Sequence, residues 1–178
     1  MTLHRSRPRW SESPFRAELR ALYAEVDELL RGWTCHCSSG TPADDETPQA
    51  LCCRFDRTGR EPHPTAVELA EVRHGMRAAG IALGDRRRLP LAAGGPCPLL
   101  SDGGRCRVYA SRPFGCRTFF CRDAAPGGHP GKGGPRMPRD AVQAIGRRIA
   151  DLSARFDPRD PHPRPLVRAL AIPEADRG

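Results

Sequence analysis

The sequence predicts a small, loop-rich single domain, α-rich or α+β, organised around a cysteine-ligated metal centre with flanking helices. The chain has 178 residues, a length that fits one domain, and hydrophobic residues make up 38% of it. With 18 glycines and 19 prolines, much of the chain is expected to be loop. A modest core in such a chain needs a further constraint, and eight cysteines can supply one by binding metal.

The N-terminal third is predicted to hold one amphipathic helix. Residues 1–13 are polar and predicted to be disordered, whereas apolar residues recur at spacings of three and four from Pro14 onward. Ser13 suits the N-cap, Pro14 the first helical position and Gly32 the end of this helix. We expect its apolar face to pack in the core, and that face comprises Phe15, Leu19, Leu22, Tyr23, Val26, Leu29 and Leu30.

A second helix is predicted to begin after Thr65. The run Thr65-Ala-Val-Glu68 has the capping-box pattern, in which the two polar side chains satisfy free amides at a helix start. Val67, Val72 and Met76 follow on one face, and Gly80 ends the helix. For residues 90–121, where glycine and proline surround four cysteines, we expect irregular loops and short strands.

The C-terminal third is predicted to contain a linker, a helix and a tail. Residues 124–138 are rich in glycine and proline, which is typical of a flexible linker. Segment 139–157 is predicted to hold a helix from Asp140 to Phe156, and its apolar stripe is Val142, Ile145, Ile149 and Leu152. The tail, residues 158–178, contains five prolines and is predicted to be extended.

The eight cysteines lie in residues 14–123, the predicted metal-binding domain. No apolar run follows the basic N-terminus as in a secretory signal, so we expect a soluble, cytoplasmic protein. In a reducing cytosol such cysteines are metal ligands more often than disulfides. They form two blocks of four, the number that completes a zinc site or an iron–sulfur cluster: Cys35, Cys37, Cys52 and Cys53, then Cys97, Cys106, Cys116 and Cys121.

The spacing of the cysteines leaves the metal and the number of centres open. Four residues separate Cys116 from Cys121, which is wide for a zinc knuckle, and one separates Cys35 from Cys37, which is tight. Neighbouring side chains in an extended chain point to opposite faces, so adjacent cysteines at 52 and 53 reach one centre only where the chain turns sharply. Otherwise one packs, or each serves a different centre.

Several other polar residues are candidates for the site. His36 lies between two cysteines and is a further candidate ligand. The Arg60–Glu61 pair and Glu68 could act as acid/base groups, although a surface ion pair and a helix cap explain them more simply. Four arginines flank the second block and could lower thiol pKa values or offset cluster charge, unless they are merely solvated: Arg105, Arg107, Arg117 and Arg122.

Longer runs of residues resemble a known family, the YkgJ-type cysteine-cluster family, over residues 33–122. That family is described as a zinc- or iron-chelating domain with a CxxCxxCC signature. The first half of the resemblance lies in Cys52-Cys53-Arg-Phe-Asp, Thr58-Gly-Arg-Glu-Pro62 and Thr65-x-x-Glu68. The second half lies in Cys97-Pro-Leu-Leu, Gly104-Arg-Cys106-Arg-Val-Tyr109 and Arg112-Pro-Phe-Gly-Cys116-Arg-Thr-Phe-Phe-Cys121.

The resemblance implies that cysteines of this chain chelate metal. In a related branch, the flagellin lysine methylases, such a domain is joined to an iron–sulfur-dependent activity. This sequence departs from the family pattern in the first block, because fourteen residues separate Cys37 from Cys52. Cys35 and Cys37 are therefore the weaker candidates, and the ligands that the resemblance favours are Cys52, Cys53, Cys97, Cys106 and Cys116.

These patterns predict a protein that holds an iron–sulfur cluster, of the 4Fe–4S type, or an iron centre. It would act in electron transfer or as an accessory to a redox or protein-modifying enzyme, which would be its partner. The alternative is a zinc-stabilised binding module for protein or nucleic acid. The net charge of +8 is spread along the chain, so a nucleic acid is not the expected partner. No apolar run approaches a membrane span, and no common catalytic motif is present.

Overall fold

The computed structural model describes five stretches of the chain: residues 9–33, 51–82, 95–119, 137–160 and 162–171. Within these stretches the regular structure is helical, with one isolated β-bridge between Leu100 and Cys106 and no strand. The prediction of a helix-rich small domain is confirmed. The short strands expected within residues 90–121 do not form in the described part, where glycine and proline leave room for one bridge and short helical turns.

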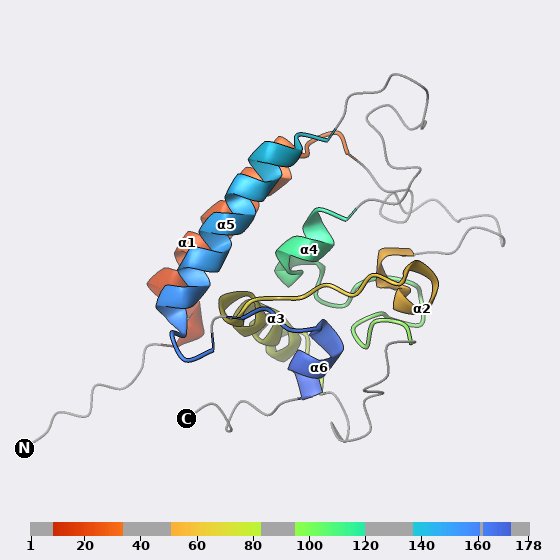
Figure 1. The fold of residues 1–178 in the computed structure, drawn as a ribbon. Coiled ribbons are helices and arrows are strands. Elements are labelled where there is room, and N and C mark those ends of the chain that lie inside the picture. The colour runs from red at the N-terminus through yellow and green to blue at the C-terminus, as the bar shows by residue number, and fades with distance from the viewer. Residues whose placement is uncertain (1–8, 34–50, 83–94, 120–136, 161, 172–178) are drawn as a thin grey trace, which may run out of the picture.

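Two long helices, α1 (Pro14–Leu29) and α5 (Arg139–Phe156), lie side by side and run antiparallel (Figure 1). Both were predicted at nearly these bounds. Ser13 is the N-cap of α1, and Gly32 just beyond the helix has a φ of 89°, which favours glycine. The apolar faces of the two helices meet in one hydrophobic cluster that includes Leu19, Leu22, Tyr23, Val26, Ile145, Ile149 and Leu152. The predicted stripes are therefore core.

The third helix of the core, α3 (Ala66–Ala78), begins with the predicted capping box. The Glu68 carboxylate accepts hydrogen bonds from the backbone N–H and the hydroxyl of Thr65, both at 2.9 Å. Val67 joins the α1–α5 cluster, whereas Val72 and Met76 belong to a second cluster. Because α3 contributes to both clusters, it connects the long helical pair to the part of the chain that carries the cysteines.

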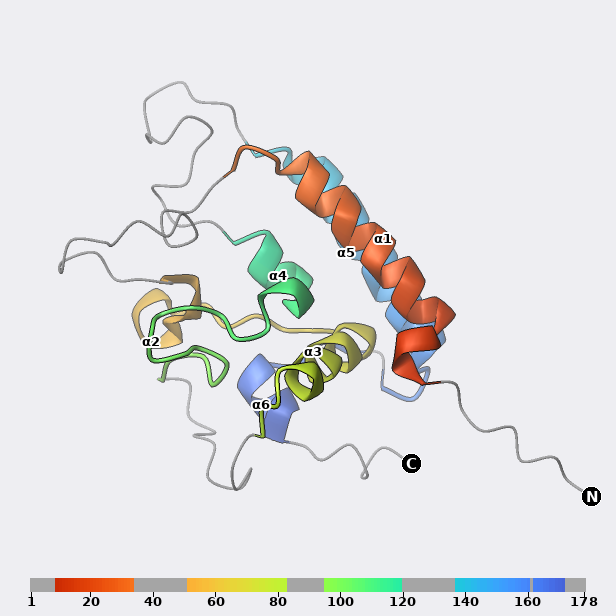
Figure 2. The same cartoon turned by 180° about the vertical axis from the view of Figure 1, so that it is seen from behind.

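The remaining elements are short. In both views α2, α4 and α6 lie on the same side of the α1–α5 pair as α3 (Figures 1 and 2). The second cluster is built from α3, α2, α6 and loop residues, and it includes Cys53 and Cys97, whereas Phe114 of α4 packs against the α1–α5 cluster. The short elements are η1 (Trp10–Glu12), η3 (Leu51–Cys53), α2 (Phe55–Thr58), η5 (Tyr109–Ser111), α4 (Phe114–Arg117) and α6 (Leu166–Ala171).

The structure differs from the sequence prediction at both ends. The segment predicted to be disordered contains η1, where the Trp10 ring packs edge-on against Phe156 with 5.4 Å between the ring centroids. The tail predicted to be extended contains α6. Four of its five prolines precede this helix and one follows it, and Leu166 and Leu170, four residues apart, are both buried. The predicted linker lies outside the described residues up to position 136.

No helix among the described residues is long and apolar enough to cross a membrane.

Candidate metal centre

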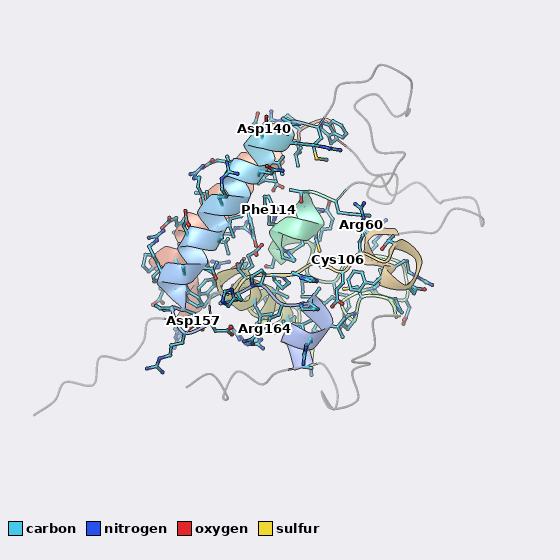
Figure 3. The ribbon with its side chains drawn as sticks, in the orientation of Figure 1. Arg60, Cys106, Phe114, Asp140, Asp157 and Arg164 are labelled. Carbon is cyan, nitrogen blue, oxygen red and sulfur yellow. The ribbon has the colours of Figure 1, made fainter. Side chains whose placement is uncertain are left out.

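Five of the eight predicted ligands lie in the described residues, and none of these five is in a disulfide there: Cys52, Cys53, Cys97, Cys106 and Cys116. They come from three short segments, namely η3, the loop from Cys97 to Cys106, and α4. Cys106 lies in the part of the molecule that holds α2 and α4, away from the α1–α5 pair (Figure 3). The other predicted ligands lie outside the described residues, namely Cys35, Cys37 and Cys121, as does His36.

The adjacent cysteines Cys52 and Cys53 lie in a tight helical turn, η3, rather than in extended chain. Their sulfur atoms are therefore 3.9 Å apart and lie on the same side of the chain. This meets the condition under which both could serve one centre. The backbone also joins this turn to the second block, because the Cys97 N–H donates to the Cys53 carbonyl at 2.7 Å.

Cys97 and Cys106 lie at the two ends of one tight loop. The β-bridge pairs Leu100 with Cys106, and within it the Ser101 N–H donates to the Arg105 carbonyl at 2.9 Å. The chain thereby doubles back and returns Cys106 toward Cys97. Cys97 is buried and Cys106 is partly buried against the same hydrophobic cluster.

Cys116 is carried by α4, a single helical turn that is fixed by contacts at its first residue. The Phe114 N–H donates to Glu68 Oε1 at 2.6 Å, and the Tyr23 hydroxyl donates to the same oxygen at 3.3 Å. The Phe114 ring faces α5 at Gly146, where an added Cβ would lie 3.2 Å from the ring (Figure 3). Glu68 is thus a cap and an anchor for two helices, which confirms the simpler reading of this residue.

Three of the described thiols, those of Cys53, Cys106 and Cys116, have raised pKa values. A hydrogen bond with Cys52 lowers the pKa of Cys53. A second hydrogen bond with Cys97, burial and the charges of Cys97 and Cys106 outweigh it and raise that pKa to about 12. Burial raises the pKa of Cys116 further above its usual range, and the nearby Cys53, Cys106 and Cys52 add to this. Burial also raises the pKa of Cys106.

Arg112 is the residue near the thiols that sequence reasoning did not single out. Its positive charge acts to lower the pKa of both Cys106 and Cys116. Its Nε is buried and has no hydrogen-bond partner among the described residues. The guanidinium group lies 4.0 Å from the centre of the Tyr109 ring. Arg112 lies four residues before Cys116, but other arginines lie closer to a cysteine in the sequence, so spacing alone does not identify it.

The arginines that were singled out have other surroundings. Arg117 is buried, and it donates to Asp27 and to two backbone carbonyls, so it is neither solvated nor directed at the thiols. Arg105 and Arg107 are exposed, and Arg122 lies outside the described residues.

The Arg60–Glu61 pair also has surroundings other than those expected. Glu61 Oε1 accepts a hydrogen bond from the Val167 N–H at 2.6 Å, which ties the start of α6 to the chain before α3. The guanidinium group of Arg60 lies 5.6 Å from the centre of the Phe119 ring. These contacts give Glu61 a structural role at α6.

The described residues fit a thiophilic metal in donor chemistry but do not form a finished ligand set. No three of their His, Cys, Asp or Glu side chains form a group that could hold a metal ion. The thiols nevertheless lie near one another. Cys53 is hydrogen-bonded to Cys52 and Cys97, and the charges of Cys53, Cys106 and Cys52 raise the pKa of Cys116. Sulfur ligands suit zinc and iron–sulfur clusters.

No family model, no curated protein and no solved structure matches this chain. The resemblance to the YkgJ-type cysteine-cluster family therefore stays a prediction that depends on the residues quoted for it.

Proposed function

We propose that this chain is a cysteine-cluster metal-binding protein that holds an iron–sulfur cluster or an iron centre. One observation carries the proposal: five thiols from three separate segments lie near one another without forming a disulfide among themselves. Four of them lie in or against one hydrophobic cluster, and Cys116 is near enough to the others for their charges to raise its pKa. The chain would act in electron transfer or as an accessory to a redox or protein-modifying enzyme. We also propose that the protein is cytoplasmic, where a reducing environment keeps cysteines available to bind metal.

The simpler alternative is that these cysteines are small core residues. Buried cysteine does pack as a small hydrophobe. The segments that carry the thiols are, however, short turns closed by backbone hydrogen bonds, and they already bury Phe55, Leu99 and Val108 in the same cluster. Because larger apolar side chains fill this cluster, it does not need several cysteines as packing residues, which favours a ligand role over a packing role.

In the proposed site the protein supplies sulfur ligands and a protected setting for them. Cys52, Cys53, Cys97, Cys106 and Cys116 would bind the metal, joined by cysteines outside the described residues. Bound iron would supply one-electron chemistry and bound zinc would supply fold stability. The Arg112 charge offsets part of the negative charge of ligating thiolates. The hydrophobic cluster around Cys53 and Cys97 limits water access.

Metal analysis separates the iron proposal from its zinc alternative, because a set of sulfur donors suits both. The full chain would be purified without oxygen, and its visible absorption, iron, sulfide and zinc would be measured. A coloured protein with iron supports the proposal, with acid-labile sulfide marking a cluster. A colourless chain with about one or two zinc atoms supports a zinc-stabilised binding module, and a metal-free chain rejects both.

Single substitutions test the ligands. Cys106→Ser and Cys116→Ser should each lower metal content and the midpoint of thermal unfolding, since ligation and folding are coupled. Val142→Ala is a matched control, because it opens a cavity in the α1–α5 cluster and removes no thiol. Full metal content in both cysteine variants would overturn these assignments. Cys35→Ser, Cys37→Ser and Cys121→Ser in the same assay test the ligands outside the described residues.

A further inference from the structure

A basic groove lies between α1, α3 and the segment that follows Cys106. Its volume is about 410 Å³. Helix α1 contributes Arg16 and Arg20, and Arg107 comes from the opposite segment. Helix α3 contributes Gly75 and Ala78 to the lining, and η5 packs closely on α3 at Gly75, where an added Cβ would lie 2.7 Å from Ser111.

The one carboxylate in this groove is already neutralised. Glu71 is fully buried and accepts hydrogen bonds from Trp10 Nε1 at 2.9 Å, Arg16 Nε at 2.8 Å and Ser111 Oγ at 3.2 Å. Arg20 Nη1 lies 3.7 Å from Glu71 Oε1 and donates to the Ala110 carbonyl at 2.9 Å, yet its side chain is 46% exposed. Arg107 is exposed as well. Three arginines thus line the groove against one carboxylate that is held by its own donors, so the groove attracts anions.

An exposed aromatic side chain lies in the same lining. Among the described residues, Tyr109 is the large apolar side chain that is exposed, at 52%. The guanidinium group of Arg112 supports the ring, 4.0 Å from its centre, and this contact restricts the ring in the free protein. Tyrosine and arginine are the residue types that contribute most to binding at protein interfaces.

We propose that this groove docks an acidic segment of a partner protein. Carboxylates of the segment pair with Arg20 and Arg107, and an apolar side chain packs on Tyr109. Arginine binds carboxylates bidentately, and small, charge-complementary contacts are typical of transient complexes. The proposal goes beyond metal binding and does not depend on it. The groove adjoins the thiols, because the Val108 N–H bonds to the Cys106 sulfur, so a docked partner would lie beside them.

The test is a fluorescence anisotropy titration of the full chain with a dansyl-labelled peptide of glutamate residues and one tyrosine. Arg107→Gln should weaken binding about fivefold or more, equivalent to ~1 kcal/mol. Tyr109→Ala should weaken binding as well, and it does so without changing the net charge. The matched control is Arg147→Gln, which removes one exposed positive charge from α5, outside the groove.

The outcomes separate this groove from general attraction to a basic protein. Equal losses for Arg107→Gln and Arg147→Gln, or no binding at low salt, would overturn the proposal. Tighter binding of a single-stranded oligonucleotide with the same dependence on Arg107 would identify a nucleic-acid site instead. Self-association in analytical ultracentrifugation that Arg107→Gln abolishes would identify a second copy as the occupant. Binding of the peptide to the metal-free chain would show that docking does not require the metal.

Discussion

Arg117 and Asp27 form a two-pronged contact, in which Arg117 Nη1 donates to both carboxylate oxygens of Asp27 at 3.0 and 2.7 Å. The guanidinium group also lies 4.1 Å from the centre of the Tyr23 ring. The pair joins α1 to α4, the turn that carries Cys116, although 90 positions separate the two residues in sequence. The long helices and the cysteine segments are therefore coupled through one buried side chain.

Arg117→Met should lower the free energy of unfolding by about 2–4 kcal/mol. It leaves the carbonyls of Ala110 and Arg112 without the donors that now lie 2.8 and 3.0 Å away. Asp27 is half-exposed and recovers hydration, which limits the loss. Urea denaturation measures the change. Arg31→Met is the control, because this exposed arginine pairs with Glu28 on the surface and should cost less than about 0.5 kcal/mol.

Gly75→Ala should destabilise the fold although alanine favours helix by about 1 kcal/mol. A Cβ at position 75 would lie 2.7 Å from Cβ and Oγ of Ser111, so α3 and η5 would have to separate. Overpacking costs typically 1–3 kcal/mol, and we expect a net loss of about 1 kcal/mol in urea denaturation.

Gly103→Ala is the control, because the nearest atom to its added Cβ would be Ser101 Oγ at 3.8 Å, which is an ordinary van der Waals contact. Combining Gly75→Ala with Ser111→Gly removes the clash and should recover part of the loss. If the Gly75→Ala variant is as stable as the parent chain, η5 can move away from α3 without loss of stability.

Helices α1, α3 and α5 could be predicted because their sequences carry the information locally. Apolar residues at spacings of three and four mark the buried faces, and the Thr65–Glu68 capping box marks the start of α3. Helix α6 was missed because a six-residue helix is too short to show a period and follows several prolines.

The site was less predictable than the fold. The cysteines and the turn requirement at Cys52 and Cys53 could be inferred from residue type and adjacency. The role of Arg112 could not, because its position beside Cys106 and Cys116 depends on how the loop from Cys97 and helix α4 come together. Contacts such as Trp10 with Glu71, which are 61 positions apart, leave no local signal in the sequence.

Acid should weaken the fold through Glu71. Burial alone would raise the pKa of its carboxyl group, but hydrogen bonds from Arg16 and Trp10 outweigh burial and lower it below the ordinary value of 4.5. The stabilisation is fully present above pH 4.5 and is lost as the pH falls through the lower pKa of the folded state. Urea denaturation from pH 6 down to about pH 3 should show a steeper decline for the parent chain than for Glu71→Gln.

A conservative change at a surface carboxylate is the control for this pH effect. Glu28→Gln removes an exposed acid whose pairing with Arg31 is on the surface, so the parent pH profile should persist. If Glu71→Gln has the same acid profile as the parent chain, other carboxylates determine the acid unfolding.

Arg112→Gln should weaken metal binding through the thiols. Without this charge the pKa values of Cys106 and Cys116 rise further, so more work is needed to remove the protons that a metal displaces. We expect zinc affinity of the reduced chain at pH 7 to fall about tenfold, as is common when a residue next to metal ligands is replaced. The pH at half-loading should rise. Arg105→Gln removes an exposed charge from the same loop and should change neither quantity.

A readout without metal separates an electrostatic role of Arg112 from a packing role against Tyr109. Alkylation rates of the thiols in the metal-free chain, followed against pH, report their pKa values, because the thiolate is the reacting form. Arg112→Lys keeps the positive charge but loses the planar group, so it should retain most of the parent alkylation profile, whereas Arg112→Gln should shift that profile to higher pH. If the alkylation profiles of Arg112→Lys and Arg112→Gln shift equally, the positive charge does not set the thiol pKa values. The contact of the planar guanidinium group with Tyr109 would then be the important one.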